Sequence, residues 1–355
     1  MKKIRVLIVE DSPTVRLVLE QIIGADPRLE VAASVGSAET LLTVLETVAP
    51  DVISLDIRLP GMNGLDATQE VMRRRPTPIV VVAADVSAED GRLAMNALRA
   101  GALAVMEKPV GFGHAAYAGV AQRLCDQLVL MSKVKVVRQM MRRPLALTSD
   151  QPAPPRMAGP VPADGYSVLG IVASTGGPAA LVQVLAGLGP GFPLPVLLVQ
   201  HIGGGFLDGF ADWLSSQTPF AVRIAQSGET ARSATVYLAP PDRHLLLRGH
   251  RLELSAEPPV AGQRPSGTVL LQSIAASAGP RGMGVVLTGM GHDGAEGLLD
   301  LARAGGHTVA EDASTAVVYG MPAAAVDLGA VKALLPLTTI APHLLGRVGA
   351  RGGVQ

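Results

Sequence analysis

Short apolar runs that end in a charged or small polar residue recur along this chain and constrain its fold more than any other feature. Four lie in the first half, IRVLIVED, DVISLD, PIVVVAAD and ALAVMEKP, and segments with helical spacing of apolar residues separate them. Strands that alternate with helices predict a parallel sheet with right-handed crossovers. The composition agrees, because 48% of the residues are apolar and only 3% aromatic, which favours α/β cores built from aliphatic side chains.

A basic and then proline-rich segment, residues 133–165, divides the chain into two parts. Its second half cannot hold a regular helix or strand, because prolines recur every few residues. A chain of 355 residues is long enough for two domains that each bury a core. We therefore expect a first domain over residues 1–124, a linker over 125–164 that is helical and then proline-rich, and a second domain over 165–349.

Charge and cysteine content exclude several classes of function. The formal net charge is zero at pH 7, so no electrostatic feature indicates nucleic acid or an anionic membrane surface as a partner. A single cysteine, Cys125, excludes an internal disulfide. No apolar stretch approaches the roughly 20 residues needed to span a bilayer, and acids interrupt the first apolar run too early for a signal peptide. We expect a cytoplasmic protein without membrane insertion.

Three carboxylates and a lysine stand at or just after strand ends in the first half: Glu10, Asp11, Asp56 and Lys108. The carboxyl ends of parallel strands meet at one edge of a sheet, so these side chains are expected to lie together. Grouped carboxylates repel one another unless a cation lies among them, and oxygen ligands suit Mg²⁺. Any one of these acids could merely cap a loop. Together they predict a site where a carboxylate beside Mg²⁺ attacks a phosphoryl group.

At these residues the first half resembles a response-regulator receiver domain. The resemblance covers the acidic pair Glu10 and Asp11, Asp56 with the PGMNG turn after it, and Lys108 in its KP pair. It implies a flavodoxin-like domain with a five-stranded parallel sheet. It also implies that Asp56 accepts a phosphoryl group from a histidine kinase, with Mg²⁺ held by Glu10, Asp11 and Asp56 and with Lys108 contacting the phosphoryl oxygens.

Two positions depart from the receiver pattern. Ala83 stands where receivers usually carry Ser or Thr, and Val105 stands where they usually carry an aromatic residue. Both parts of the usual switch are therefore replaced. Phosphorylation of Asp56 is still expected, but its coupling to the second domain requires another group, such as the hydroxyl of Ser87.

The stretch GIVASTGGP at residues 170–178 opens the second half with the pattern of a strand, a tight turn and a helix. Such a turn suits either a phosphate cradle or an exposed nucleophile. It lacks G-x-G-x-x-G and the lysine of a P-loop, and it matches G-x-S-x-G only in part, because Val172 replaces the first glycine. By itself the turn leaves both interpretations open.

Three further strand ends carry a hydroxyl, an imidazole and a carboxylate: Ser174 after GIVA, His201 after PVLLVQ, and Asp293 after GVVL. A hydroxyl becomes a nucleophile when a base takes its proton, and a carboxylate fixes the tautomer of that base. Separately, His201 could be an ordinary strand-end histidine and Asp293 could cap the helix after it. His292 is a poor partner for its own neighbour, and His244 follows a turn. The three residues together predict an acyl-transfer site.

The second half, residues 165–349, resembles the catalytic domain of CheB-type protein-glutamate methylesterases in ASTGGP, LLVQHI, LTGMGHDGAEGL and TAVVYGMP. The resemblance implies a doubly wound, mostly parallel α/β domain with an antiparallel hairpin. It makes Ser174 the nucleophile, His201 the general base and Asp293 the acid that orients it. Thr175 would help to place the histidine, and Met290 would offer its backbone N–H to the oxyanion. HIGGGF after the base departs from the family, which more often has prolines there.

Together the two resemblances imply a phosphorylation-regulated hydrolase of chemosensory adaptation. It would remove methyl esters from glutamates of methyl-accepting chemoreceptors, release methanol, and deamidate receptor glutamines, with no cofactor for the ester chemistry. The phosphodonor would be a histidine kinase of the chemotaxis type. A non-enzymatic adaptor remains an alternative, although no triad residue is lost. A lipase-like hydrolase of small esters would explain the triad but not the receiver.

Overall fold

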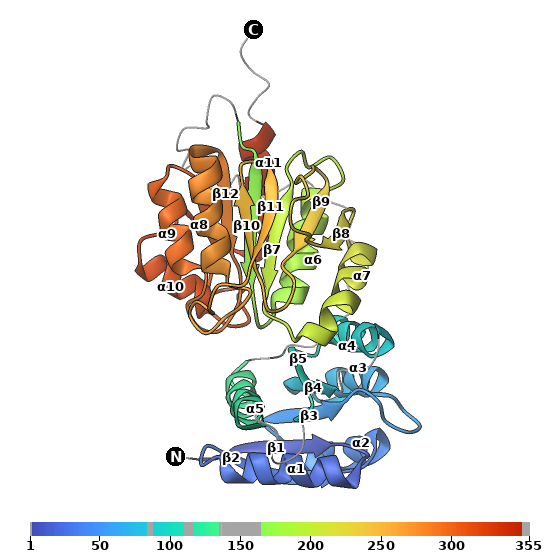
Figure 1. Ribbon diagram of the computed structural model, residues 1–355. Coiled ribbons are helices and arrows are strands. Elements are labelled where there is room, and N and C mark those ends of the chain that lie inside the picture. Colours follow the sequence, from blue (N-terminus) through green and yellow to red (C-terminus); the bar gives the residue numbers. More distant parts are fainter. Residues whose placement is uncertain (1, 84–87, 110–116, 135, 137–164, 350–355) are drawn as a thin grey trace. The chain divides into compact units, whose positions relative to one another are not determined.

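A computed structural model describes residues 2–83, 88–109, 117–134, 136 and 165–349 (Figure 1). The chain forms two compact units, Met1–Ser149 and Asp150–Gln355. Among the described residues, no helix is both long and apolar enough to cross a membrane.

The first unit is a five-stranded sheet in the order β2-β1-β3-β4-β5, with every neighbouring pair parallel. Its strands are β1 (Ile4–Val9), β2 (Leu29–Val35), β3 (Val52–Asp56), β4 (Ile79–Ala83) and β5 (Ala104–Glu107). Its helices are α1 (Pro13–Ala25), α2 (Ala38–Val48), α3 (Gly64–Arg74), α4 (Ala88–Ala100) and α5 (Tyr117–Met131). The flavodoxin-like sheet expected from the sequence is confirmed.

Polar side chains cap the N-termini of three of these helices. The side chains of Ser12, Ser37 and Asn63 accept hydrogen bonds from amides in the first turns of α1, α2 and α3. Helices α1 and α5 cover one face of the sheet, and α2, α3 and α4 cover the other (Figure 1). The side-chain caps satisfy backbone amides that the first turn of a helix leaves without an intrahelical partner.

Helix α5 extends beyond residue 124, where the sequence analysis ends the first domain. Leu124, Leu128 and Met131 on this helix are buried, and Arg28 bonds Asp126 at 2.7 Å. The helical part of the expected linker therefore begins as the last helix of the first unit, because its apolar face packs against that unit's sheet.

The second unit is a seven-stranded, all-parallel sheet in the order β14-β13-β12-β6-β7-β9-β8. Its strands are β6 (Val168–Ala173), β7 (Val196–Gln200), β8 (Ala221–Ile224), β9 (Thr235–Leu238), β12 (Gly282–Val286), β13 (His307–Glu311) and β14 (Ala333–Leu335). Strands β10 (His244–Arg248) and β11 (Arg251–Ser255) form a separate antiparallel hairpin. This arrangement confirms the expected fold class.

Helices cover both faces of the second sheet. They are α6 (Gly177–Leu188), α7 (Leu207–Gln217), α8 (Gly267–Ala278), α9 (Ala295–Arg303), α10 (Met321–Asp327) and α11 (Leu337–Gly349), with short 3-10 turns at Gly204–Phe206 and Gly279–Arg281. Helices α6, α7 and α11 lie on one face, and α8, α9 and α10 lie on the other, where the β10–β11 hairpin packs against α8 (Figure 1).

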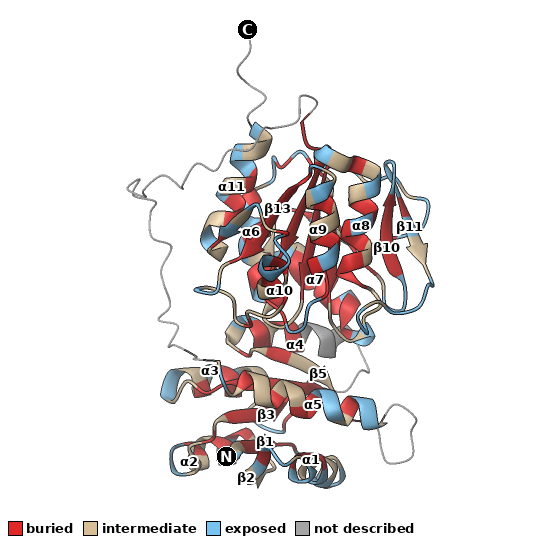
Figure 2. Ribbon diagram, turned by 90° about the vertical axis from the view of Figure 1, so that its left-hand side faces the viewer, coloured by how far each residue is buried: buried red, intermediate tan, exposed pale blue. Residues whose placement is uncertain are grey.

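Most of each sheet is buried while the outer faces of the helices remain exposed (Figure 2). Strand β6 lies between β12 and β7, where the order of the strands reverses direction. Such a switch point opens a crevice at the carboxyl ends of the strands, which is where α/β proteins bind their ligands. The sheet order therefore puts the ends of β6, β7 and β12 at the favoured position for a site.

Candidate active site

The ends of β6 and β7 place Ser174 and His201 next to each other. The amide of His201 donates to the carbonyl of Ala173 at 3.0 Å, which continues the parallel pairing of the two strands by one residue. Asp293 comes from the loop after β12, the neighbour of β6 on its other side. The sheet thus collects the three expected residues from three strand ends.

His201 and Asp293 are in direct contact. His201 Nε2 lies 2.9 Å from Asp293 Oδ2, with side-chain exposures of 12% and 3%. The other ring nitrogen, Nδ1, is therefore the one that can act on a substrate. Among the described residues, no hydrogen bond joins the hydroxyl of Ser174 to His201. Such bonds are often loose until substrate binds, so the structure pairs two members and places the third beside them.

The carboxylate of Asp293 also lies at the N-terminus of helix α8. Its Oδ1 accepts hydrogen bonds from the Ser266 hydroxyl at 2.6 Å and the Thr268 amide at 3.0 Å, and its Oδ2 accepts one from the Gly267 amide at 2.6 Å. Burial alone would raise the pKa of Asp293. The hydrogen bond and the positive charge of His201 lower it, and so do hydrogen bonds from Ser266 and Thr268. Together they outweigh burial and lower the pKa of Asp293 to about 2. The carboxylate therefore stays ionised at neutral pH.

Asp293 does not cap α9, the helix that follows it in the chain. Helix α9 is preceded by Gly294 and has no side-chain cap. Asp293 instead caps α8, which comes earlier in the chain, while the Ser266 hydroxyl at the start of α8 bonds Asp293 rather than its own helix. Gly267 is required here, because a Cβ on it would collide with Val172 of β6. The helix end can therefore approach the sheet closely enough to hold the carboxylate.

The turn that carries Ser174 is held by its own backbone. The carbonyl of Ser174 accepts hydrogen bonds from the amide of Gly177 at 2.8 Å and from Gln200 Nε2 at 2.9 Å. Gly176 has a φ of +79°, a conformation that favours glycine. Helix α6 begins directly after this turn, and the N-terminus of a helix carries a partial positive charge. The site therefore combines the Ser174 hydroxyl with a helix end that favours negative charge.

Thr288 connects this turn to the loop after β12. Its carbonyl accepts the amide of Ser174 at 3.0 Å, and its hydroxyl donates to the carbonyl of Thr175 at 2.9 Å. The same hydroxyl accepts the amide of Val318 at 2.9 Å. Met290 follows two residues later and is 48% exposed. The loop that would offer the Met290 amide to an oxyanion is thus tied to the nucleophile turn.

Several of these residues carry little or no recognisable signal in the sequence. Ser266 and Thr268 stand in RPSGT, whose only local signal is a serine before a helix, and Thr288 lies in the LTG segment. His244 is buried outside the triad, where its Nδ1 accepts the Ser266 amide at 3.2 Å. His292 is exposed. Their contacts join distant segments, so no local pattern could have identified them.

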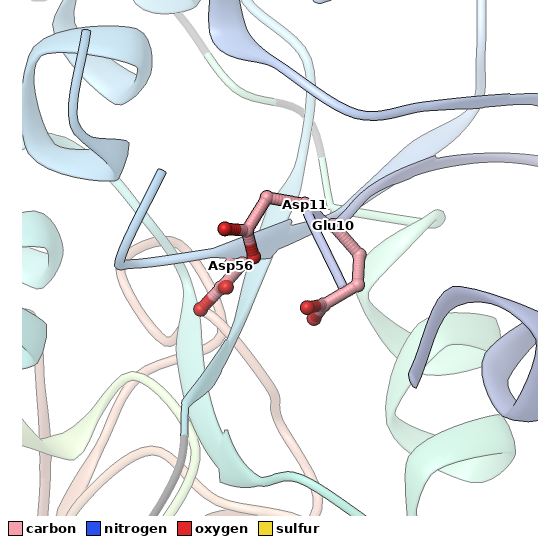
Figure 3. A group of neighbouring side chains, drawn as sticks. All are labelled: Glu10, Asp11 and Asp56. Atoms are coloured by element: carbon pink, nitrogen blue, oxygen red, sulfur yellow. The ribbon is translucent and has the colours of Figure 1, made fainter. Parts of the chain in front are cut away.

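The carboxyl edge of the first sheet brings the other predicted site together. Glu10, Asp11 and Asp56 each offer an oxygen within 4.8 Å of the others (Figure 3). Lys108 Nζ lies 2.8 Å from both Glu10 and Asp56. Burial raises the pKa of Glu10 and Asp56, and the hydrogen bonds from Lys108 offset this only in part. Three clustered oxygen donors with one exposed member, Asp11, fit a hard cation such as Mg²⁺.

The two departures from the receiver pattern lie inside the first sheet. Ala83 ends β4 and is buried, and Val105 lies on β5 opposite Val81. Neither offers the hydroxyl or the aromatic ring of the usual switch. Ser87, the possible substitute, lies outside the described residues.

Comparisons with known proteins follow the same division of the chain. Residues 169–344 match the family described as CheB methylesterase, and residues 6–115 match the response regulator receiver domain. A protein-glutamate methylesterase/protein-glutamine glutaminase of Paramagnetospirillum magneticum is 59% identical over 97% of both chains. One of Myxococcus xanthus is 42% identical over 99% of both. The crystal structure of the CheB methylesterase catalytic domain of Thermotoga maritima covers 51% of this chain and 98% of its own, with 32% identity and a TM-score of 0.49.

Proposed function

The chain belongs to the family of CheB methylesterases that carry a receiver domain, and we propose that Ser174, His201 and Asp293 perform its chemistry. It is a protein-glutamate methylesterase and protein-glutamine glutaminase. Its substrates are γ-glutamyl methyl esters and glutamine side chains of chemoreceptors, so it serves adaptation in chemosensory signalling. Residues 165–349 form the catalytic domain. The observation that carries this proposal is the buried Asp293 carboxylate, held by α8 and bonded to His201 at 2.9 Å.

The geometry assigns a role to each nitrogen of His201. With Nε2–H donating to Asp293, Nδ1 is the basic nitrogen. His201 Nδ1 takes the proton of the Ser174 hydroxyl as its oxygen attacks the ester carbonyl. It then gives that proton to the methoxy oxygen as the bond from this oxygen to the carbonyl carbon breaks, and methanol leaves. Water then attacks the acyl-enzyme. His201 Nδ1 takes a proton from this water and gives it to the oxygen of Ser174, which frees the glutamate. With a glutamine side chain the leaving group is ammonia.

Negative charge on the carbonyl oxygen is stabilised by backbone donors. The amide of Met290 and the positive end of α6 after the Ser174 turn supply this stabilisation, and Thr175 helps to place His201. One such donor contributes about 3 to 4 kcal/mol in comparable acyl-transfer sites. The ionised Asp293 stabilises the imidazolium that forms on His201, which is why its low pKa supports this mechanism.

The receiver domain regulates this activity through phosphorylation of Asp56. Glu10, Asp11 and Asp56 would hold Mg²⁺, which would supply positive charge to offset the negative charge of the phosphoryl oxygens. Lys108 bonds Asp56 at 2.8 Å and is therefore placed to contact the phosphoryl oxygens. The donor is a histidine kinase of the chemotaxis type. Because Ala83 and Val105 lack the usual switch groups, the coupling uses other residues.

The test is methanol release from membranes that contain labelled, methylated chemoreceptor. We expect Ser174→Ala to abolish release while thermal unfolding stays as in the unmodified protein, because only the nucleophile is lost. Ser233→Ala, an exposed serine of the same domain, is the matched control. Methanol release by Ser174→Ala would overturn the assignment. Turnover of p-nitrophenyl acetate without any turnover of receptor would instead indicate a hydrolase of small esters.

A further inference from the structure

Glu311 is a buried carboxyl group that the mechanism above does not use. It ends strand β13 beside β12, at the same edge of the sheet as Ser174, and it is 0% exposed. Its Oε2 accepts the backbone amide of Thr288 at 2.8 Å. The ion pairs found among the described residues do not include Glu311. A buried acid without an ion pair at the edge that carries the chemistry requires an explanation.

Thr288 transmits the position of Glu311 to the nucleophile. The amide of Thr288 donates a hydrogen bond to Glu311, and the carbonyl of Thr288 accepts one from the amide of Ser174 at 3.0 Å. The hydroxyl of Thr288 holds the carbonyl of Thr175 at 2.9 Å. Glu311 therefore holds a residue that bonds both the Ser174 amide and the Thr175 carbonyl, which flank the Ser174–Thr175 peptide.

Thr288 also begins the loop that would bind the oxyanion. Gly289 follows it and is held by the carbonyl of Val318 at 3.0 Å, and Met290 comes next. Oxyanion donors act only when they lie within a few tenths of an ångström of their position in the transition state. A displacement of Thr288 would move both the Ser174 turn and the Met290 amide, so it would lower the rate of the chemical step.

Burial and hydrogen bonding affect the pKa of Glu311 in opposite directions. Burial raises the pKa of Glu311, and hydrogen bonds from the Thr288 amide and the Thr315 side chain oppose this only in part. Burial therefore disfavours the charged form of Glu311 relative to an exposed glutamate, and either form has an oxygen that accepts the Thr288 amide. What the contact demands is an acceptor oxygen at the reach of a Glu side chain.

We propose that Glu311 is a positioning residue for the esterase reaction, which holds the Thr288 amide so that the Ser174 turn and the oxyanion loop keep their reactive geometry. This inference rests on the proposed function of the site. Glu311 acts through reach and acceptor capacity rather than through charge. It does not touch the substrate.

Three variants of the full-length protein separate these properties. Glu311→Gln keeps the reach and an acceptor oxygen, Glu311→Asp keeps the acid but is shorter by one methylene, and Glu311→Leu keeps the size without an acceptor. We expect kcat for methanol release to stay within about threefold for Gln and to fall about 10- to 100-fold for Asp and Leu, since a misplacement near 1 Å costs about 100-fold. KM is expected to stay unchanged. Asp312→Asn is the control, because this adjacent half-buried carboxylate accepts the Ser314 amide rather than that of Thr288.

Rates are compared per folded molecule, below the unfolding temperature of each variant, because a merely structural role would lower that temperature without changing kcat. Equal kcat in Glu311→Asp and the unmodified protein would overturn the proposal, and so would equal loss in Gln and Asp. If Leu does not fold, the Gln and Asp variants still decide. Methanol release by Ser174→Ala would refute the proposed function itself. If Ser174→Ala releases no methanol and the Glu311 variants keep the kcat of the unmodified protein, only the role of Glu311 is refuted.

Discussion

Replacing Gly289 with alanine should impair catalysis by crowding the nucleophile. A Cβ on Gly289 would lie 2.7 Å from Ser174 Cβ and would also collide with the sulfur of Met321. Carbon atoms pack at about 3.5 to 4.0 Å, so the two Cβ atoms must separate by about 1 Å. Gly289 is not among the glycines with positive φ, so alanine meets no backbone strain there. The effect of this substitution is therefore steric.

The backbone of Gly289 cannot easily move away. Its amide donates to the carbonyl of Val318 at 3.0 Å, and its carbonyl accepts the amides of Gly320 at 3.1 Å and Met321 at 2.9 Å. The displacement therefore falls on the Met321 side chain and on Ser174. A misplacement of 1 Å costs about 100-fold in rate, and overpacking a core costs about 1 to 3 kcal/mol in stability. We expect kcat to fall about 100-fold in a protein that is destabilised but folded.

The assay combines methanol release from methylated receptor with thermal unfolding of the same samples. Gly346→Ala on α11 is the control, because a Cβ there meets nothing within 4 Å. It makes the same chemical change in the same domain and should leave kcat unaltered. A folded Gly289→Ala protein with the kcat of the unmodified enzyme would show that the spacing between this loop and Ser174 does not limit catalysis.

Three further predictions follow from the hydrogen bonds and charges of the two sites. Ser266→Ala removes the 2.6 Å bond to Asp293, which should destabilise the protein by about 1.5 to 3 kcal/mol, as measured by denaturant unfolding. The pKa of Asp293 is lowered to about 2, so its contribution to stability is present above about pH 4 and is lost as the pH falls toward 2, by about 2 kcal/mol. Asp293→Asn should remove this part of the acid dependence. In the receiver, Mg²⁺ at about 100 times its Kd should stabilise the folded state by about 2.7 kcal/mol, and Asp11→Asn should weaken that effect.

Each of these predictions has a contrary outcome. Unchanged stability of Ser266→Ala would mean that water replaces the hydroxyl at Asp293. An identical loss of stability between pH 4 and 2 in Asp293→Asn would assign the acid dependence to other carboxylates. Equal stabilisation of Asp11→Asn by Mg²⁺ would remove Asp11 from the proposed ligands.

The fold could be predicted because its strongest determinants are local. Apolar runs of strand length alternate with helical patterns through both halves, and each run ends in a residue whose place at the carboxyl edge follows from parallel pairing. Parallel pairing by itself brings Glu10, Asp56 and Lys108 together at one edge of the first sheet. It also placed Ser174 and His201 side by side on neighbouring strands.

The chemistry of the individual groups depended on the tertiary structure. The sequence left open whether Asp293 caps the following helix, and the structure places it at the start of α8 instead. Likewise, nothing local marks Glu311 or links it to Thr288. These contacts join segments far apart in the chain, and their strength depends on burial and on the distance between two atoms. The amino-acid sequence by itself therefore determined which residues reach each edge of a sheet. Only the tertiary structure decided which donors surround each carboxyl group, and so whether burial or hydrogen bonding determines the direction of its pKa shift.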